Sequence, residues 1–358
     1  MIVGGGPAGA ATGLALANID PALARRTLLL DRAAFPRDKT CAGGLIPHTL
    51  DILRELGLDL KVPAVRVDRA VIDVAGEHID IASPGCCWVI RRREFDAMLL
   101  DAVRARGIEV RESVTLLGAR RDGDGIRLET SAGPIRARTV VGADGSGSLV
   151  RRALVDDAEG WVARATMCDV PIPADTAPTR FEFDFRPVQD GLAGYAWSFP
   201  CLIGGRPHWN VGVYSLARRG AGARIGALLD RRASAPDAQR KAHPIRLYRH
   251  GAPIAAPGVL LVGDAAGVDP LLGEGISFAL QFGQLAAASL SRGFAEGDLR
   301  FRSYRHEVAR SAMGRKLRRL GFAARVVYGR MGPLWFRVAR LSRRAQITGM
   351  NWYNGVAH

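Results

Sequence analysis

A glycine-rich turn at the start of the chain constrains the fold more than any other stretch. The glycines follow a short apolar run at the G-x-G-x-x-G spacing: Gly4, Gly6 and Gly9. In a strand-turn-helix unit, the first glycine permits the tight turn, the second admits a pyrophosphate, and the third lets the helix pack on the strand. Pro7 and Ala8 begin the expected helix, whose free N–H groups favour an anion. The spacing therefore predicts a dinucleotide-binding unit.

An acidic residue follows at the distance that such a unit requires. Residues 27–30 form a second apolar run, which ends in Asp31 and Arg32. An aspartate in this place accepts hydrogen bonds from the ribose hydroxyls of a bound dinucleotide. The glycine turn alone is also compatible with a ligand-free turn, but the strand that ends in Asp31 favours the dinucleotide.

A third stretch, residues 259–280, combines a strand, an acidic turn and a glycine loop. Its first four residues predict a buried parallel strand, Gly263 and Asp264 end that strand, and an apolar helix begins at about Ile276. The glycines before this helix let the backbone approach a flat ligand, and Asp264 can accept hydrogen bonds from the hydroxyls of a polyol. Taken alone, this stretch fits any connection between a strand and a helix.

Four further motifs complete the pattern. They are FPRDKTCAGG at residues 35–44, Arg92-x-x-Phe95-Asp96, Gly142-Ala143-Asp144-Gly145 and Tyr195-x-Trp197-x-Phe199-Pro200. With these motifs the chain resembles the FAD-dependent oxidoreductases of the aromatic hydroxylase type and, within them, the geranylgeranyl reductase family. The resemblance spans about residues 1–280, and the Cys41 and Tyr195 motifs carry most of the narrower family likeness.

The resemblance implies an α/β fold, with a Rossmann-like FAD-binding domain, an inserted antiparallel β-sheet substrate domain and a helical C-terminal tail. The FAD-binding domain is expected at residues 1–65, 88–155 and 250–300, the substrate-binding domain at 66–87 and 156–249, and a basic helical C-terminal region at 301–358. Strictly alternating aromatic residues at 181–185 and 195–199 independently predict strands in the second domain.

The same resemblance implies a set of FAD-binding residues. These are Gly4, Gly6, Pro7, Ala8, Gly9, Asp31, Arg32, Cys41, Ala42, Gly43, Arg92, Asp144, Gly263, Asp264, Pro270, Gly273, Gly275 and Ile276. Arg91 and Arg93 flank Arg92, and the sequence does not say which of the three points inward. Asp144 has a second interpretation, as the capping residue of the turn that begins at Ser148.

Three residues are candidates for catalysis by resemblance. Cys41 would lie near the reacting face of the flavin, while Tyr195 and Trp197 would shape the pocket. The plainer alternative for Cys41 is a small buried residue beside a glycine turn, and the preceding Arg37 and Lys39 could be solvated surface charges. The aromatic strands could fill an ordinary core, although the Tyr195 motif favours a cavity wall for a prenyl chain or an aromatic ring.

Length and composition bear on the number of domains, on metal binding and on the cellular location. The 358 residues suffice for two domains with substantial cores, and the five cysteines lack a metal-ligand spacing. No apolar run reaches transmembrane length and no signal peptide precedes the glycines, so we expect a cytoplasmic protein with reduced thiols and no bound metal. The sequence leaves the oligomeric state open.

Positive charge is concentrated near the C-terminus. Residues 300–344 contain 14 Lys or Arg and one acid, so they contribute +13 of the net charge of +15. An apolar stripe between Leu317 and Leu341 lies opposite these arginines, and Gly332-Pro333 is expected to kink the helix. The pattern fits peripheral contact with a membrane surface, or packing of the stripe onto the rest of the protein. No nucleic-acid motif accompanies it, so we expect no nucleic-acid partner.

The resemblance predicts FAD-dependent reduction of carbon–carbon double bonds in an isoprenoid lipid. No second G-x-G-x-x-G follows a predicted strand, so NADPH that docks transiently or an external electron carrier would supply the electrons. The alternative is a monooxygenase or halogenase for an aromatic or polyketide-like substrate. The Tyr195 motif resembles the W-x-W-x-I-P signature of halogenases but departs from it at the first and third positions. A flavin-bearing, membrane-attached binding protein is the non-enzymatic alternative.

Overall fold

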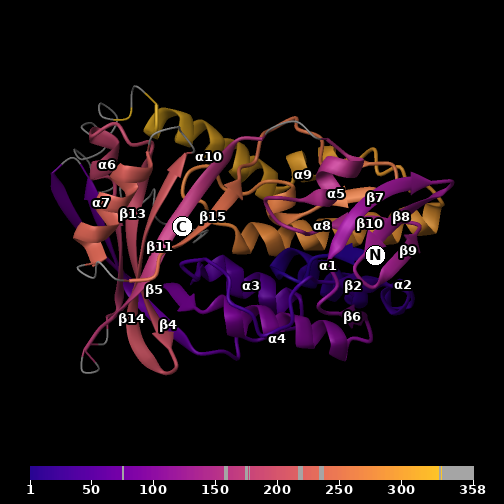
Figure 1. Ribbon diagram of the computed structural model, residues 1–358, viewed down its shortest axis with the longest axis horizontal. Helices are drawn as coiled ribbons and strands as arrows, with labels where there is room; N and C mark the ends of the chain where they lie inside the picture. Colours follow the sequence, from indigo (N-terminus) through magenta and orange to yellow (C-terminus); the bar gives the residue numbers. More distant parts are fainter. Residues whose placement is uncertain are drawn as a thin grey trace.

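Three β-sheets organise the chain in the computed structural model. The structure describes residues 1–74, 76–156, 160–173, 176, 178–216, 221–233, 238–329 and 332. Figure 1 shows an elongated molecule, with an eight-stranded sheet on the left and a six-stranded sheet with its helices on the right.

The six-stranded sheet has the strand order β16-β17-β10-β1-β2-β6. Its strands are β1 (Ile2–Val3), β2 (Leu28–Leu30), β6 (Glu109–Arg111), β10 (Val140–Gly142), β16 (Ala255–Ala256) and β17 (Val259–Leu261). All neighbours pair in parallel except β16 and β17. The strands β1, β10 and β17 are fully buried and carry no polar side chain, as in parallel sheets covered on both faces. Because the parallel strands run in one direction, the loops after β1, β2, β10 and β17 meet at one edge.

Several helices contribute buried residues to the hydrophobic core that includes this sheet. They include α1 (Pro7–Ile19), α2 (Pro21–Arg25), α3 (Pro47–Glu55), α4 (Arg92–Ala105), α5 (Leu149–Leu154) and α8 (Ile276–Glu296). The first ten residues of α1 are all buried, and a Cβ at Gly283 of α8 would lie only 2.7 Å from the Cβ of Ala11. Small residues therefore let α1 and α8 approach closely, which fixes the start of both helices at the sheet edge.

The eight-stranded sheet has the order β15-β11-β14-β13-β12-β4-β5-β3. Its strands are β3 (Gly44–Leu45), β4 (Ala64–Val74), β5 (Glu77–Ile90), β11 (Val162–Pro171), β12 (Arg180–Asp184), β13 (Gly194–Ile203), β14 (Arg206–Leu216) and β15 (Lys241–Arg246). All neighbours pair antiparallel except β12 and β4. Side chains alternate along β13, so Tyr195 and Trp197 share one face while Ala196 packs on the other with α7 (Gly222–Ala233).

The remaining sheet is small. β7 (Leu116–Asp122), β8 (Gly125–Thr130) and β9 (Gly133–Ala137) form an antiparallel meander. The helix expected to begin at Pro7 forms as α1, and the apolar helix expected from about Ile276 forms as α8. The short α6 (Arg186–Gln189) follows β12. The predicted α/β class is confirmed.

The C-terminal part of the described chain consists of α9 (Tyr304–Arg310) and α10 (Ala312–Val327). On α10 the first members of the predicted apolar stripe, Leu317, Leu320, Ala324 and Val327, are buried against the rest of the protein. The expected later members, Met331, Leu334, Val338 and Leu341, lie outside the described residues. None of the described helices combines the length and apolar character that a membrane crossing needs.

Candidate active site

The edge of the six-stranded sheet and the aromatic face of the eight-stranded sheet line a cavity of about 1570 Å³. Pockets for one small molecule usually occupy roughly 300–1,000 Å³, so this cavity has room for a cofactor and a second ligand. Glycines and charged side chains from the sheet edge line one part, whereas apolar side chains from the large sheet line the other.

The glycine turn after β1 has the close contacts that its spacing predicts. A Cβ at Gly4, where φ is +109°, would lie 2.3 Å from the Ala143 carbonyl oxygen, and a Cβ at Gly9 would lie 1.9 Å from the Gly4 carbonyl oxygen. Gly6 opens onto the cavity, since the nearest atom to a Cβ there is an Arg37 guanidinium nitrogen at 3.8 Å. No side chain caps the first turn of α1, so its N–H groups are available to an anion.

Two arginines beside this turn share one buried carboxylate. Arg92 donates to both oxygens of Asp96 at 2.6 and 2.7 Å, and Arg37 lies 3.0 Å from the same carboxylate. Two positive charges therefore face one negative charge. Arg37 Nη1 is buried and has no hydrogen-bond partner among the described residues. An unsatisfied guanidinium nitrogen next to free helix N–H groups is the donor set that a pyrophosphate requires.

The three consecutive arginines at the start of α4 point in different directions. Arg92 lines the cavity, Arg91 pairs with Asp169 at 3.0 Å, and Arg93 is exposed. Arg92, the residue predicted from the motif, is thus the inward one. Arg37 is not the solvated surface charge that the sequence allowed, because its side chain is only 19% exposed and it also lines the cavity.

Asp31 supports the glycine turn from the end of β2. Its carboxylate accepts the N–H of Gly5 at 2.7 Å and the N–H of Ala33 at 2.8 Å. Asp31 and Arg32 both line the cavity. Each carboxylate oxygen has two lone pairs, so Asp31 retains acceptor capacity for a hydroxyl while it fixes the turn.

Asp144 and Asp264 line the cavity but use their carboxylates differently. Asp144 accepts the Leu149 N–H at 2.7 Å and the Ser148 hydroxyl at 2.5 Å, so it caps the start of α5 as the second interpretation proposed. Burial raises the pKa of Asp144. Asp264 accepts the Ser146 hydroxyl at 3.0 Å through Oδ2, which leaves Oδ1 to accept a ligand hydroxyl.

Three tyrosines fix the loop between η1 (Gly263–Ala265) and α8. Their hydroxyls donate to three successive carbonyls: Tyr214 to Pro270 at 2.9 Å, Tyr328 to Leu271 at 2.6 Å, and Tyr195 to Leu272. The tyrosines come from β14, from the residue after α10 and from β13. Burial raises the pKa of each well above its usual value, so the hydroxyls stay neutral and serve as donors to the backbone.

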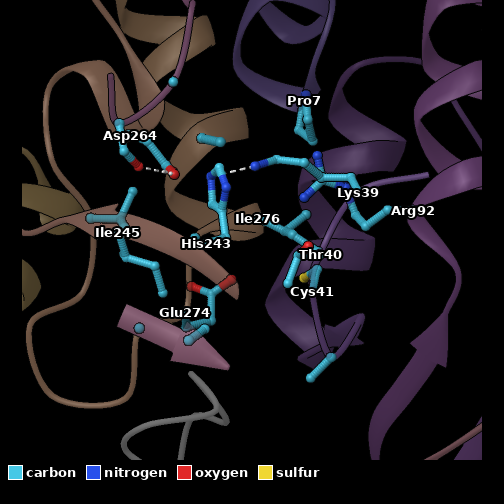
Figure 2. A pocket seen from close by; sticks show the side chains of 18 of the residues that line it. Pro7, Lys39, Thr40, Cys41, Arg92, His243, Ile245, Asp264, Glu274 and Ile276 are labelled. Carbon is cyan, nitrogen blue, oxygen red and sulfur yellow. Dashed lines mark hydrogen bonds between the residues drawn. The ribbon is translucent and has the colours of Figure 1, made fainter. Parts of the chain in front are cut away.

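Lys39 and His243 meet across the polar part of the cavity (Figure 2). Lys39 Nζ hydrogen-bonds with His243 Nε2 from β15. Burial lowers the pKa of Lys39 to about 8 and that of His243 to about 4, so neutral His243 accepts a hydrogen bond from Lys39, which keeps its proton. Because burial disfavours the ammonium form, an anion bound nearby would raise the pKa of Lys39 again.

Aromatic rings from β12 and β13 form the apolar wall. Phe181 stacks on Phe199 with ring centroids 5.2 Å apart, and Phe183 meets Tyr195 edge-on at 5.3 Å. Trp197 donates its indole N–H to Asn210 at 2.9 Å. These rings belong to a buried core cluster and also line the cavity, and their role as a wall for a prenyl chain or an aromatic ring stays a prediction.

Cys41 lies in the cavity next to Thr40 and Ile276 (Figure 2). It is partly exposed, whereas the other four cysteines are buried, and its Sγ accepts the Gly43 N–H at 3.3 Å. Gly43 has φ +81°, and a Cβ there would lie 1.9 Å from the Ile90 carbonyl oxygen. Only glycine allows this close approach, which holds the Cys41 loop against β5.

The structure brings most predicted site residues together around the cavity. Those that line it are Gly4, Gly6, Pro7, Ala8, Asp31, Arg32, Cys41, Ala42, Gly43, Arg92, Asp144, Tyr195, Trp197, Asp264, Gly273, Gly275 and Ile276. Gly9, Gly263 and Pro270 are not lining residues. They support the site from behind: a Cβ at Gly263 would lie 2.8 Å from the Cβ of Ala8, and Pro270 accepts the Tyr214 hydroxyl.

Comparisons with known proteins identify the family. Residues 1–189 match the family described as FAD binding domain. Over 327 residues the chain is 31% identical to the digeranylgeranylglycerophospholipid reductase of Methanoculleus marisnigri, covering 83% of this chain and 77% of that protein. The chain belongs to the geranylgeranyl reductase family of FAD-dependent oxidoreductases. It is also 28% identical over 321 residues to menaquinone reductase of Mycolicibacterium smegmatis, covering 82% of this chain and 76% of the relative.

Solved structures show the same fold. A geranylgeranyl bacteriochlorophyll reductase-like protein from Thermoplasma acidophilum gives a TM-score of 0.77 at 22% identity, covering 98% of this chain and 94% of the other. The flavin-dependent halogenase CmlS gives a TM-score of 0.68 at 22% identity, covering 98% of this chain and 69% of the other. At these identities the likeness concerns the fold, which reductases of this family share with halogenases.

The polar part of the cavity fits FAD, the cofactor of the family. We expect the first turn of α1, Arg37 and Arg92 to hold the pyrophosphate, because free N–H groups and an unsatisfied guanidinium nitrogen meet there. Asp31 is expected to bind the ribose, and Asp264 the ribityl chain. The glycine loop before α8 packs closely on Tyr214, since a Cβ at Gly273 would lie 2.9 Å from the Tyr214 ring, and Gly273 and Gly275 line the cavity where we expect the flavin ring.

Sequence reasoning missed several cavity residues. Arg37 and Lys39 lie within the Cys41 motif, so their place in a family motif was the available signal. His243 and Tyr214 line the cavity but belong to no motif, and only the tertiary fold brings them there. Tyr328, also outside any motif, does not line the cavity but supports its loop through the Leu271 carbonyl.

Proposed function

We propose that this FAD-dependent oxidoreductase reduces carbon–carbon double bonds of an isoprenoid lipid. One observation carries the proposal: the FAD-type polar site opens directly into a cavity part walled by aromatic rings. Such a wall suits a long apolar chain better than a polar metabolite. The relatives support the same class, because their names refer to geranylgeranyl and menaquinone lipids, and both lipids contain isoprenoid chains.

Bound FAD in its reduced form would supply hydride to one alkene carbon, and an acid would have to give a proton to the other carbon to complete the reduction. The chain's own residues orient the substrate and exclude water. We assign the aromatic wall, with Tyr195 and Trp197, to positioning of the isoprenoid chain, and the partly exposed Cys41 to the reacting region. Tyr195 shapes the wall and is not the proton donor, because its hydroxyl is already committed to the Leu272 carbonyl.

The domain roles follow from this assignment. We assign substrate binding to the eight-stranded sheet and FAD binding to the six-stranded sheet. Most of the large sheet lies in the predicted residues 66–87 and 156–249, but β3 and the ends of β4 and β5 come from the range predicted for the FAD-binding domain. NADPH that docks transiently, or an external electron carrier, is the proposed reductant. Cytoplasmic placement with peripheral membrane contact through residues 301–358 completes the proposal, since a lipid substrate is held in a bilayer.

Oxygen chemistry is the competing function. The Tyr195 motif resembles the halogenase signature, and the fold is shared with a halogenase. The two functions differ in their products: a reductase adds two hydrogens to the lipid, whereas a monooxygenase adds one oxygen atom to its substrate.

Mass spectrometry of lipid products separates these functions. Dithionite-reduced enzyme is incubated with geranylgeranyl and menaquinone-type lipids, with and without oxygen. We expect a gain of two hydrogens that does not require oxygen. An oxygen-dependent gain of one oxygen atom would refute the reductase proposal, and so would unchanged lipids together with halogenation or hydroxylation of aromatic test compounds.

A further inference from the structure

The outer face of α10 carries a stripe of positive charge. Its exposed residues recur at helical spacing on one side of the helix: Arg315, Arg318, Arg319, Phe322 and Arg325. We call this set the α10 face. α10 contains no acidic residue, and the one acid of α9, Glu307, already pairs with Arg292 at 2.5 Å. None of the ion pairs in the described part of the chain uses an arginine of the α10 face.

An aromatic side chain interrupts these arginines. Phe322 is 69% exposed, more than any other large apolar residue in the described chain. It also lines the cavity, together with Ala323, Val326 and Val327 from the same helix. A side chain that is both exposed and cavity-lining marks a place where the cavity reaches the surface. The charged stripe therefore borders an opening of the apolar cavity.

We propose that the α10 face docks on an anionic lipid bilayer, with Phe322 in the headgroup region and the cavity opening turned toward the membrane. Charge complementarity selects this partner, since each arginine near an anionic bilayer strengthens binding about fivefold. An exposed aromatic ring among arginines is what interfacial helices present to lipid. Figure 1 shows α10 along an outer edge of the molecule, where a flat surface can approach it.

Docking in this orientation would bring the cavity opening next to the lipid. A lipid chain can pass from the bilayer into the aromatic part of the cavity beside Phe322 without crossing water. This route rests on the proposed function, whereas the docking itself does not. Binding to vesicles is therefore measured without turnover, so that failure of docking and failure of the reductase assignment give different results.

Vesicle sedimentation of the full-length holoenzyme tests the proposal. Vesicles of 30% phosphatidylglycerol in phosphatidylcholine are compared with phosphatidylcholine alone at low and high salt. The double variant R318Q/R319Q removes two charges of the α10 face. The matched control R25Q/R26Q removes two adjacent exposed arginines at the end of α2, far from α10 (Figure 1). Phe322→Ser removes the apolar contact and keeps the charges.

We expect preference for the anionic vesicles, weakened about 25-fold in R318Q/R319Q, weakened about 10-fold in Phe322→Ser and unchanged in R25Q/R26Q. Equal binding to both vesicle types would overturn the proposal, as would equal losses in the two double variants. Duplex DNA that binds through the same arginines, with no vesicle binding, would assign the α10 face to nucleic acid and overturn it as well.

Discussion

Replacement of Gly43 by alanine tests whether the Cys41 loop is fixed by one close contact. Gly43 has φ +81°, and its added Cβ would lie 1.9 Å from the Ile90 carbonyl oxygen. The positive φ alone costs a non-glycine residue about 1–2 kcal/mol. The overlap adds about 1–3 kcal/mol, and more if the 3.0 Å hydrogen bond from the Ile90 N–H to the Gly43 carbonyl breaks. We expect Gly43→Ala to lower the free energy of unfolding by about 2–5 kcal/mol.

Gly191→Ala is the matched control. Gly191 has φ +78°, but nothing lies within 4 Å of a Cβ there, so the variant carries the strain of the dihedral angle without the collision. Denaturant unfolding followed by far-UV circular dichroism, with and without added FAD, gives both free energies. We expect Gly191→Ala to cost only about 1–2 kcal/mol. Equal losses in the two variants would show that the contact with Ile90 does not hold the loop.

Four other predictions concern the cavity. Arg37→Gln should weaken FAD binding about 10- to 100-fold, since a charge-assisted hydrogen bond contributes about 1.5–3 kcal/mol. Flavin fluorescence titration measures the affinity, and the exposed control Arg93→Gln should leave it unchanged. Equal effects of the two variants would show that Arg37 does not bind the pyrophosphate. Burial holds the pKa of Lys39 at about 8, so above that pH the flavin-free protein has a neutral amine there. A bound pyrophosphate raises this pKa, so FAD binding should take up a proton above pH 8 and weaken as pH rises; calorimetry in buffers of different ionisation enthalpy would detect the uptake, and Lys39→Met that still takes up the proton would refute it. Cys41→Ser should retain the flavin spectrum and slow turnover at least about tenfold, and unchanged turnover would make the thiol structural. Gly212→Ala would place a Cβ 2.0 Å from the Trp197 ring, so KM for the lipid should rise while the affinity for FAD stays constant. Loss of FAD would contradict the assignment of FAD and lipid to separate parts of the cavity.

The cofactor half of the site could be predicted because its signals are local. The spacing of Gly4, Gly6 and Gly9 predicts a tight turn, because Gly4 and Gly9 lie too close to backbone carbonyls for any side chain. Asp31 could be predicted because it comes directly after the next apolar strand. Short apolar runs were enough to indicate buried parallel strands. These features depend on few long-range contacts, so a single sequence displays them.

The other half depends on where distant segments meet. His243 belongs to an unremarkable strand and reaches Lys39 only because β15 lies at the edge of the large sheet. Which of Arg91, Arg92 and Arg93 points into the cavity depends on the rotation of α4 about its axis and on the partners Asp96 and Asp169. The sequence does not determine that rotation. Asp144 caps α5, as one of its two interpretations proposed, and its part in FAD binding stays a prediction.

The three tyrosyl hydrogen bonds to Pro270, Leu271 and Leu272 connect the large sheet and α10 to the loop that precedes α8. Tyr195 and Tyr214 belong to the paired strands β13 and β14 of the large sheet, while the carbonyls belong to the loop that precedes α8. A displacement of either strand therefore moves the loop with it, instead of widening the gap between them. We therefore expect motion of the large sheet to change the distance between the FAD-type site and the aromatic wall less than it would without these three hydrogen bonds.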